Sequence, residues 1–380
     1  MAGVREHVGH GRLDVRIERR GGRVAGAAGG SGAHFERVAL RVDGRRLDAV
    51  LKVMAPDDLS PPLERRFYRE LAAEVSARVP RVYATGELAG TPDGWVLLEV
   101  LPPGKPRTAW TSADLLACAR EIARLHAPRL GRAPAWLPRP LTRDARLFLA
   151  HVPAGVARLR SFVAARPAWR WFAPERAMAA AEALARDPSP IVEALARSPE
   201  TLIHRDCHVG NVAVVDGERP ILFDWEAVSA GPPIFDLALF FRHLDWQWTV
   251  VPLLGVEWSR LRPPPLEWDE LAGAYLDELE ERAHAPIDRA VIAAAAPAAF
   301  AWEAAYRIGW IEPLLARHAG WMRLARSRVP LLGPLARWLV DLPGLLSRAT
   351  LWPGVERFAP GSDPGAGAPG GRAPAGASIV

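Results

Sequence analysis

Two side-chain types are scarce in this chain, and each scarcity narrows what the protein can be. Cysteine occurs only at Cys118 and Cys207, so we expect neither a disulfide framework nor a cysteine-built zinc site. A reducing, cytoplasmic setting fits this usage best. Lysine occurs only at Lys52 and Lys105, whereas the other 46 of the 48 basic residues are arginine. Because arginine is used almost everywhere else, each of these two lysines is a candidate for a role that needs an ammonium group.

The sequence also lacks long apolar runs and concentrated positive charge. No stretch approaches the roughly 18 uncharged apolar residues of a membrane-spanning helix. Residues 1–12 carry charged side chains and no apolar signal core. The net charge of +5 arises from basic residues that are interleaved with acidic ones. We therefore expect no stable membrane insertion, no export and no nucleic-acid partner. The oligomeric state has no signature in the sequence.

Alternation of apolar and polar residues predicts a mostly β region at the start of the chain. Two runs flank Asp43-Gly44, a strong hairpin signal. The predicted strands cover 13–17, 35–42, 47–53, 79–83 and 95–100, with a helix over 61–76.

Beyond residue 101 the apolar residues recur with helical spacing, and Ser112 is a plausible N-cap. The predicted helices cover 112–126, 144–164, 174–196, 232–244, 268–282 and 287–311. One β interruption is predicted at 212–215 and 221–223, with a turn at Asp216-Gly217. The chain therefore reads as an α+β protein of two lobes, mostly β over 1–101 and helical over 102–358. The Gly-, Ala- and Pro-rich residues 359–380 are predicted to be disordered.

The most informative segment lies around this β interruption. Asp206 follows the apolar pair Leu202-Ile203, Asn211 stands five residues further on, and Asp224 ends the returning strand. A hairpin between them brings Asn211 and Asp224 together, and such oxygen ligands suit Mg²⁺. The remaining carboxylate, Asp206, can accept a proton from a substrate hydroxyl.

A zinc hydrolase is the rival interpretation of the same segment. His204, Asp206 and His208 are all residue types that ligate zinc. No second histidine cluster with metal-ligand spacing follows downstream, and Asn211 would have no role. The spacing instead matches the kinase catalytic loop H-R-D-x-x-x-x-N followed by a metal-binding aspartate.

The longer pattern resembles the superfamily of aminoglycoside phosphotransferases and choline kinases. It comprises His204-x-Asp206-x-His208-x-Gly210-Asn211, then Phe223-Asp224-Trp225-Glu226, then Gly231-Pro232 and Asp236-Leu237-Ala238. The pattern differs from protein kinases at His208, where they usually carry lysine, and at Trp225-Glu226, which replaces Phe-Gly. Only eleven residues separate Asp224 from Asp236, which leaves no room for an activation segment.

The resemblance implies a bilobal protein-kinase-like fold and a role for each motif residue. Asp206 would be the catalytic base or the group that orients the substrate hydroxyl. His204, also a residue of the catalytic loop, would brace that loop together with Asp236. Asn211 and Asp224 would hold Mg²⁺. Glu226 is either a supporting residue of the metal site or a polar residue at a strand end.

The first lobe would then bind the nucleotide. Lys52 ends the run Ala49-Val50-Leu51-Lys52, which resembles the kinase pattern V-A-I-K, and would neutralise nucleotide phosphates. Glu64 on the following helix is the predicted partner of Lys52, and Glu70 is the alternative. The alternative role for Lys52 is an ordinary solvated lysine at a strand end.

The rest of the nucleotide site has weaker signals. Gly30, Ser31 and Gly32 could cradle phosphates with their backbone amides, or could simply belong to a flexible loop. The backbone near Glu99 and Leu101 would meet the nucleobase. Backbone recognition leaves no side-chain signature, so ATP and GTP are equally compatible with the sequence.

The predicted reaction is transfer of the γ-phosphoryl group to a hydroxyl of a small molecule, with an aminoglycoside or amino sugar as candidate acceptor. A choline, sugar or amino-acid kinase of the same fold is the alternative, and a nucleotide-binding pseudokinase is a second. Acidic residues over 267–281 could attract a polycation, and tryptophans such as Trp302 and Trp310 could hold a quaternary amine. A solvated helix face and core packing are the ordinary alternatives for these two groups.

Overall fold

The structure is a computed structural model that describes residues 15–23, 33–42, 45–54, 63–87, 94–165, 167, 175–249 and 266–313. The predicted phosphate loop at Gly30, Ser31 and Gly32 and the predicted disordered tail over 359–380 lie outside the described residues. Within the described part of the chain, no helix is both long and apolar enough to cross a membrane.

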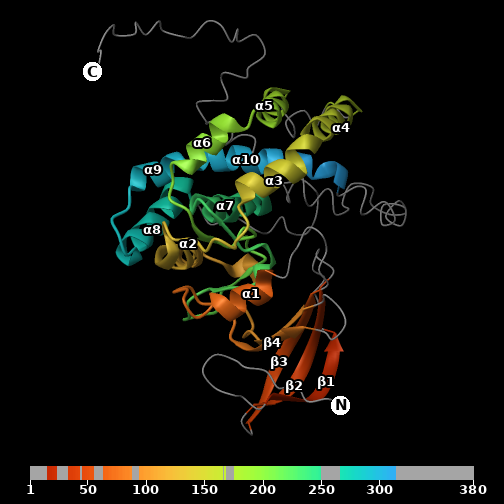
Figure 1. Ribbon diagram of the computed structural model, residues 1–380, viewed down its shortest axis with the longest axis vertical. Coiled ribbons are helices and arrows are strands. Elements are labelled where there is room, and N and C mark those ends of the chain that lie inside the picture. Colours follow the sequence, from red (N-terminus) through yellow and green to blue (C-terminus); the bar gives the residue numbers. More distant parts are fainter. Residues whose placement is uncertain are drawn as a thin grey trace, which may run out of the picture.

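A five-stranded antiparallel sheet lies at one end of the molecule, and most helices lie at the other (Figure 1). Its strand order is β1-β2-β3-β5-β4. Val42 is paired with Arg45, which confirms the hairpin predicted around Asp43-Gly44. The strands are β1 (Val15–Arg23), β2 (His34–Val42), β3 (Arg45–Met54), β4 (Val82–Glu87) and β5 (Gly94–Glu99).

Helix α1 (Leu63–Glu70) lies between the sheet and the other helices (Figure 1). Leu63 and Phe67 are buried on one face of it, as the apolar row predicts. The prediction of a helix over 61–76 is wrong at its C-terminal end, where α1 stops at Glu70. The carbonyl oxygen of Phe67 accepts hydrogen bonds from both Leu71 and Ala72, and this ends the regular helical ladder.

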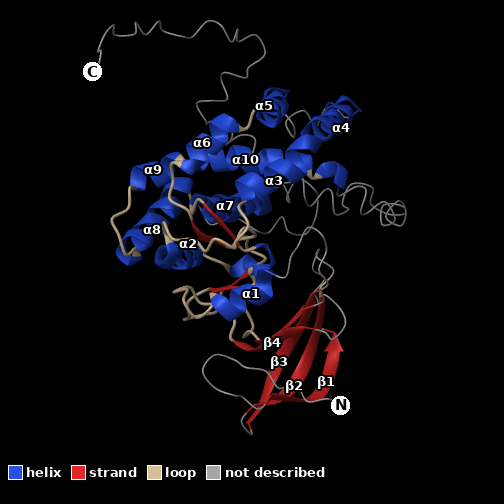
Figure 2. Ribbon diagram, in the orientation of Figure 1, coloured by secondary structure: helices blue, strands red, loops and turns tan. Residues whose placement is uncertain are grey.

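The remaining helices form the larger part of the molecule (Figure 2). They are α2 (Ser112–His126), α3 (Pro140–Phe148), α4 (Val152–Ala165), α5 (Glu175–Arg186), α6 (Ser189–Ala196), α7 (Ile234–Thr249), α8 (Trp268–Arg282), α9 (Arg289–Ala294) and α10 (Ala296–Gly309). The mixed helix and strand content predicted from the sequence is therefore confirmed. The division into lobes at residue 101 stays a prediction.

Three predicted helices are each broken in two, and proline stands at every break. The predicted helix 144–164 becomes α3 and α4 with Pro153 in the first turn of α4. The helix 174–196 becomes α5 and α6 at Pro188, and 287–311 becomes α9 and α10 at Pro297. Proline lacks the backbone N–H that a continuous helix needs, but it is tolerated in a first turn.

The N-cap of α2 is Thr111 rather than the predicted Ser112. The Thr111 hydroxyl accepts a hydrogen bond from the Asp114 N–H at 3.3 Å, and the Asp114 carboxylate accepts one from the Thr111 N–H at 2.6 Å. This reciprocal pair is a capping box, which satisfies two helix-end donors at once.

Two short antiparallel pairs support the segment that carries the motif. Strand β6 (Thr201–Ile203) pairs with β9 (Ser229–Gly231), and β7 (Val212–Ala213) pairs with β8 (Ile221–Leu222). The predicted β interruption is thus confirmed, with Gly217 at a φ of +72° in the turn. The motif segment therefore folds back on itself within a helical surrounding.

Helix α10 packs against α4, α5, α6 and α7, and small residues allow the close approach. A Cβ atom added to Gly155 on α4 would overlap the backbone carbonyl of Ile308 on α10. Gly273 on α8 has no atom within 4 Å of the corresponding position, and so provides a matched control.

We expect Gly155→Ala to destabilise the fold by about 1–3 kcal/mol, because two helix backbones must separate. Gly273→Ala should instead stabilise by about 0.5–1 kcal/mol, since alanine loses less backbone entropy in a helix. Urea unfolding of both variants measures the difference. Equal effects of the two substitutions would contradict the close packing of α4 on α10.

Candidate active site

The loop after β6 has an unusual backbone that a buried carboxylate holds in place. Arg205 has a φ of +67°, a conformation that costs a non-glycine residue of order 1–3 kcal/mol. The carboxylate of Asp236 on α7 accepts hydrogen bonds from the backbone N–H of His204 at 2.6 Å and of Arg205 at 2.8 Å. These two bonds hold the loop that presents Asp206.

Asp236 is itself the middle of a fully buried chain of polar groups. His126 on α2 lies with Nε2 3.0 Å from Asp236 and Nδ1 2.8 Å from the hydroxyl of Tyr275 on α8. Burial alone raises the pKa of Asp236, but the hydrogen bond and charge of His126, with His204, bring it below its ordinary value. Asp236 is thus an ionised anchor that ties the loop to α2 and α8.

His204 lies beneath the loop. Its ring is fully buried 4.4 Å from the ring of Trp225, and its Nε2 is 2.9 Å from the carbonyl oxygen of Phe223. This geometry links the loop to the far strand of the hairpin. It does not fit a zinc ligand, and the described residues hold no group of three or more His, Cys, Asp or Glu side chains that could bind a metal ion.

Asp206 has its carboxylate partly open to solvent, with 36% of the side chain exposed. Asn211 Nδ2 donates to Asp206 Oδ2 at 2.9 Å and to the Asp206 carbonyl at 3.0 Å. His208 accepts the Gly210 N–H on Nδ1 at 2.8 Å, which leaves Nε2 to face Asp206 Oδ2 at 3.5 Å. Two side chains therefore fix the orientation of this carboxylate.

The charges around Asp206 keep it ionised. Burial alone raises the pKa of Asp206, but the charge and hydrogen bond of His208, with the charges of His204 and Arg307, bring it well below its ordinary value. Arg307 comes from α10, which the sequence did not connect with this site. An ionised, oriented carboxylate can accept a hydrogen bond from a hydroxyl group.

The hairpin brings Asn211 and Asp224 to the same end, as the sequence predicts. The Phe223 N–H donates to the Asn211 carbonyl at 3.0 Å, directly beyond the β7–β8 pairs. Asp224 follows with a φ of +70° and with 26% of its side chain exposed. Like Arg205, it is a non-glycine residue in the left-handed region, so the chain around it must determine this conformation.

Lys52 connects the sheet to this hairpin. Its Nζ lies 2.5 Å from Glu64 Oε2 and 2.5 Å from Asp224 Oδ1, and only 2% of the side chain is exposed. Burial alone lowers the pKa of Lys52, but the two carboxylates raise it above its ordinary value. Burial also raises the pKa of Glu64, more than Lys52 lowers it. Strand β3, helix α1 and the β7–β8 hairpin thus meet at one ammonium group.

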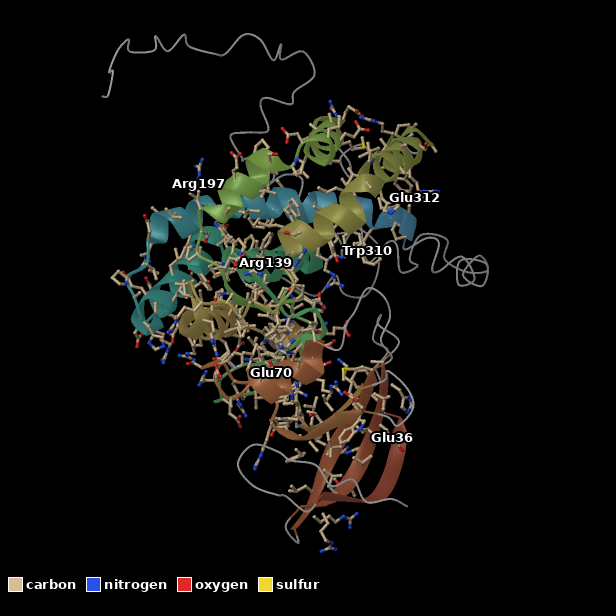
Figure 3. The ribbon with its side chains drawn as sticks, viewed as in Figure 1. Glu36, Glu70, Arg139, Arg197, Trp310 and Glu312 are labelled. Carbon is tan, nitrogen blue, oxygen red and sulfur yellow. The ribbon has the colours of Figure 1, made fainter. Side chains whose placement is uncertain are left out.

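Glu64 rather than Glu70 is the partner of Lys52. Glu70 instead pairs with Arg66 at 3.0 Å and with Arg69 at 2.9 Å, at the end of α1 (Figure 3). Glu226 lies further from the ammonium, with Oε2 3.9 Å from Lys52 Nζ. The solvated strand-end interpretation of Lys52 is wrong, because the side chain is buried between carboxylates.

An aromatic stack joins the same two elements. The rings of Phe67 on α1 and Trp225 lie 3.9 Å apart and nearly parallel, at 11°. Trp225 is fully buried and also contacts His204. The stack fixes the residue after Asp224 against the helix that carries Glu64.

Glu99 and Leu101 lie at the end of the last strand of the sheet. The Glu99 N–H donates to the Arg81 carbonyl at 2.9 Å, and the Glu99 side chain accepts the Arg81 N–H at 3.0 Å. Leu101 follows two residues later and is partly buried. Their predicted contact with a nucleobase stays a prediction.

Some of the candidate acceptor residues make structural contacts in the described part of the chain. Glu278 of the acidic stretch is buried and pairs with Arg124 and Arg282, and Asp277 pairs with Arg289. Trp302 is 1% exposed in the core, and the Trp310 ring stacks 4.5 Å from Phe148 at the end of α10 (Figure 3). Core packing therefore accounts for Trp302, whereas Asp269, Glu270 and Glu281 are exposed, and the attraction of a polycation by this stretch stays a prediction.

Two side chains at the open end of the hairpin could hold a magnesium ion. Both hydrogen bonds from the Asn211 side chain use its nitrogen, so the amide oxygen is the atom that could ligate a cation. Asp224 supplies a partly exposed carboxylate. An amide oxygen and a carboxylate fit Mg²⁺, which takes oxygen ligands and keeps several waters.

The buried ion pair generates a stability prediction. We expect Lys52→Met to destabilise the protein by about 3–5 kcal/mol, because Glu64 is left buried without its cation. A second change, Glu64→Gln, made on top of Lys52→Met should recover much of this loss. Urea unfolding of the two single variants and the double variant measures the coupling. Additive losses would contradict a direct pair between Lys52 and Glu64.

Solved structures share this architecture. An aminoglycoside phosphotransferase from Alicyclobacillus acidocaldarius is 15% identical, with a TM-score of 0.50 over 90% of this chain and 91% of that one. A choline kinase from Cryptosporidium parvum is 12% identical, with a TM-score of 0.50 over 91% of this chain and 92% of that one. At such identities the likeness shows the fold, which agrees with the predicted resemblance.

Comparison with curated protein sequences finds no match. A family model described as APH, the phosphotransferase enzyme family, matches residues 27–259, which is more than half of the chain. The match spans Lys52, Glu64, Asp206, Asn211 and Asp224, the residues that the structure gathers around the hairpin. The chain belongs to the phosphotransferase enzyme family.

Proposed function

We propose that the chain is a Mg²⁺-dependent phosphotransferase that moves the γ-phosphoryl group of ATP or GTP to a hydroxyl group of a small molecule. The observation that carries the proposal is the position of Lys52 Nζ, 2.5 Å from both Glu64 and Asp224. The loop that leads into the β7–β8 hairpin presents Asp206, which Asn211 orients. The segment 206–224 thus carries both a carboxylate for a hydroxyl group, Asp206, and a partner of the cation for phosphates, Asp224.

In this proposal the nucleotide binds between a mostly β lobe and a helical lobe. Lys52 neutralises phosphate charge as a compact ammonium group, and Glu64 keeps it in place. The backbone at Glu99 and Leu101 meets the nucleobase, while Gly30, Ser31 and Gly32 offer backbone amides to the phosphates. Because these base contacts are made by the backbone, either ATP or GTP can serve.

Asn211 and Asp224 are the proposed Mg²⁺ ligands. Held by these two residues, Mg²⁺ would supply positive charge that offsets the negative charge of the phosphate groups. The Asp224 carboxylate also contacts Lys52, so this residue would join the cation site to the ammonium group. Glu226, 3.9 Å from Lys52, lies near enough to support this site.

Asp206 is the proposed acceptor of the substrate proton. The acceptor oxygen forms a bond to the γ-phosphorus while the bond from that phosphorus to the β–γ bridging oxygen breaks. The nucleoside diphosphate leaves, and the hydroxyl proton passes to Asp206. His204 and Asp236 position the loop but do not touch the reacting atoms in this scheme.

The acceptor is proposed as a small alcohol, with an aminoglycoside or amino sugar as the first candidate. A choline, sugar or amino-acid kinase of the same fold is the alternative. A nucleotide-binding pseudokinase is a further alternative, disfavoured because Lys52, Asp206, Asn211 and Asp224 are all present. Both cysteines are free and buried, which supports the proposed cytoplasmic location.

The test is turnover with Mg²⁺, ATP or GTP and a panel of aminoglycosides, amino alcohols and sugars, followed by mass spectrometry. We expect one product heavier by a phosphoryl group. Asp206→Asn should reduce kcat by about 10²–10⁴-fold and leave nucleotide affinity unchanged. Nucleotide binding by calorimetry without any product would favour the pseudokinase, and the absence of nucleotide binding would overturn the proposal.

The pKa of Asp206 generates a second prediction, on pH dependence. Because this pKa is lowered in the folded protein, Asp206 stays ionised through the range where aspartate ordinarily titrates, so kcat/KM should show no loss from this group as the pH falls to about 4. His208→Asn keeps an acceptor for the Gly210 N–H but removes the ring nitrogen that faces Asp206. The pKa of Asp206 then rises, and the loss of kcat/KM moves to higher pH. Superimposable profiles of the two proteins would contradict the role of His208.

A further inference from the structure

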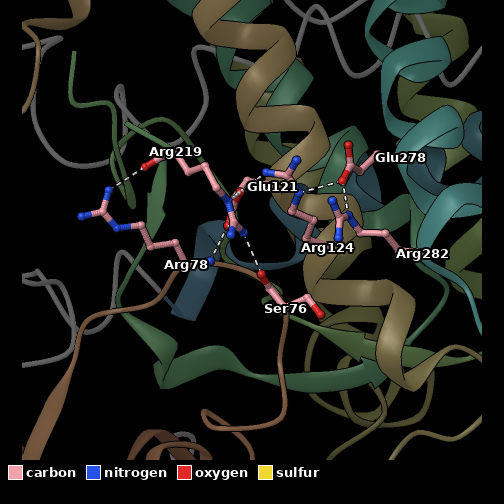
Figure 4. A network of polar contacts seen from close by, with 7 residues as sticks. All are labelled: Ser76, Arg78, Glu121, Arg124, Arg219, Glu278 and Arg282. Atoms are coloured by element: carbon pink, nitrogen blue, oxygen red, sulfur yellow. Dashed lines mark hydrogen bonds and ion pairs between the residues drawn. The ribbon is translucent and has the colours of Figure 1, made fainter. Parts of the chain in front are cut away.

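A buried carboxylate on α2 is the centre of a polar network that the proposed mechanism does not use (Figure 4). Glu121 is fully buried and accepts four hydrogen bonds. Its Oε1 accepts the Arg78 N–H and Arg219 Nη2, the latter at 2.6 Å, and its Oε2 accepts Arg219 Nε and Arg124 Nη1, both at 3.0 Å. Because each oxygen accepts two hydrogen bonds, the carboxylate is held in one orientation.

Apart from Arg124, which lies on α2 itself, the donors to Glu121 come from two segments that lie far apart in the sequence. Arg78 belongs to the segment 71–81 that follows α1, and Arg219 belongs to the turn of the β7–β8 hairpin. The two segments are also bonded to each other. Arg219 Nη2 donates to the Ser76 carbonyl at 2.7 Å, Arg78 Nη1 donates to the Arg219 carbonyl at 3.1 Å, and the Leu222 N–H donates to the Arg78 carbonyl at 2.9 Å.

Each of these segments leads to one half of the Lys52 site. The segment 71–81 continues directly from α1, which carries Glu64. The hairpin begins after Asn211 and ends before Asp224. Glu121 therefore joins, at one point on α2, the element that positions Glu64 and the element that positions Asp224.

We infer that Glu121 and Arg219 are positioning residues that set the hairpin against α1, so that Asp224 meets Lys52 in a competent geometry. The inference rests on the proposed function. Residues that orient a metal ligand without touching the metal typically change metal affinity by about 10–100-fold when they are replaced. The expected effect of losing Arg219 is thus a higher Mg²⁺ requirement.

The network contains its own matched control. Arg219 is 48% exposed and pairs with buried Glu121, whereas Arg282 is 40% exposed and pairs with Glu278, which is 7% exposed. Arg282 lies on α8, and its partner Glu278 belongs to the same helix. Arg219→Ala and Arg282→Ala therefore remove the same group from similar surroundings, but only the first touches the hairpin.

The first readout needs neither metal nor nucleotide. Lysine labelled at the ε-carbon and ζ-nitrogen gives only two side-chain NMR signals, because the chain has only two lysines. We expect Arg219→Ala to move the Lys52 signal and Arg282→Ala to leave it in place. An unmoved Lys52 signal in a folded Arg219→Ala variant would overturn the inference.

The second readout is the Mg²⁺ concentration at which the nucleotide affinity reaches half of its maximum. Calorimetry measures the nucleotide affinity as the Mg²⁺ concentration is raised. Arg219→Ala should raise it about tenfold relative to Arg282→Ala. Arg219→Lys keeps the charge but loses the forked guanidinium group that contacts Glu121 and Ser76 together. Its Mg²⁺ requirement should therefore lie between those of the wild type and Arg219→Ala. This variant replaces Arg219→Ala in the test if the alanine variant does not fold. Equal values in Arg219→Ala and Arg282→Ala would overturn the inference while leaving the proposed function intact. Failure of the wild-type protein to bind any nucleotide would overturn the proposed function instead.

Discussion

The ammonium group of Lys52 is the contact on which the arrangement of the site depends. It is buried between two carboxylates that come from a helix and from a hairpin more than a hundred residues further along the chain. A buried charge without a partner is costly, so Lys52 and Glu64 cannot be separated without a large loss of stability. This constraint holds β3, α1 and the β7–β8 hairpin together. Of the three charged residues, only Asp224 is partly exposed, so a ligand can reach it.

The loop that presents Asp206 depends on a different anchor. Asp236 holds two consecutive backbone N–H groups around the left-handed Arg205, and it is held in turn by His126 and Tyr275. The two anchors meet at Trp225, which contacts Phe67 on one side and His204 on the other. The site therefore rests on two sets of contacts, the ion pairs of Lys52 and the backbone hydrogen bonds of Asp236. The side chain of Trp225 joins them.

The sequence predicted the parts of the site that depend on short spacings. The hairpin that joins Asn211 to Asp224 follows from Asp216-Gly217, and the pairing of Lys52 with Glu64 follows from the strand–helix order and the family resemblance. Contacts between distant segments carried no such signal. Nothing in the sequence separates Glu121 or Arg219 from the many other charged residues, and Thr111 and Ser112 are both ordinary N-cap residues. The helix breaks at Pro188 and Pro297 were open to prediction, since proline in a helix interior is unfavourable.

The central claim is that the Lys52 ammonium group is where nucleotide phosphates bind. Its most direct test is a titration of lysine-labelled protein with Mg²⁺ and nucleotide, monitored through the side-chain NMR signals, with Lys105→Arg to assign them. We expect the Lys52 signal to move to saturation at the affinity found by calorimetry, and the Lys105 signal to stay in place. Nucleotide that binds with an unchanged Lys52 signal would show that its phosphates lie elsewhere.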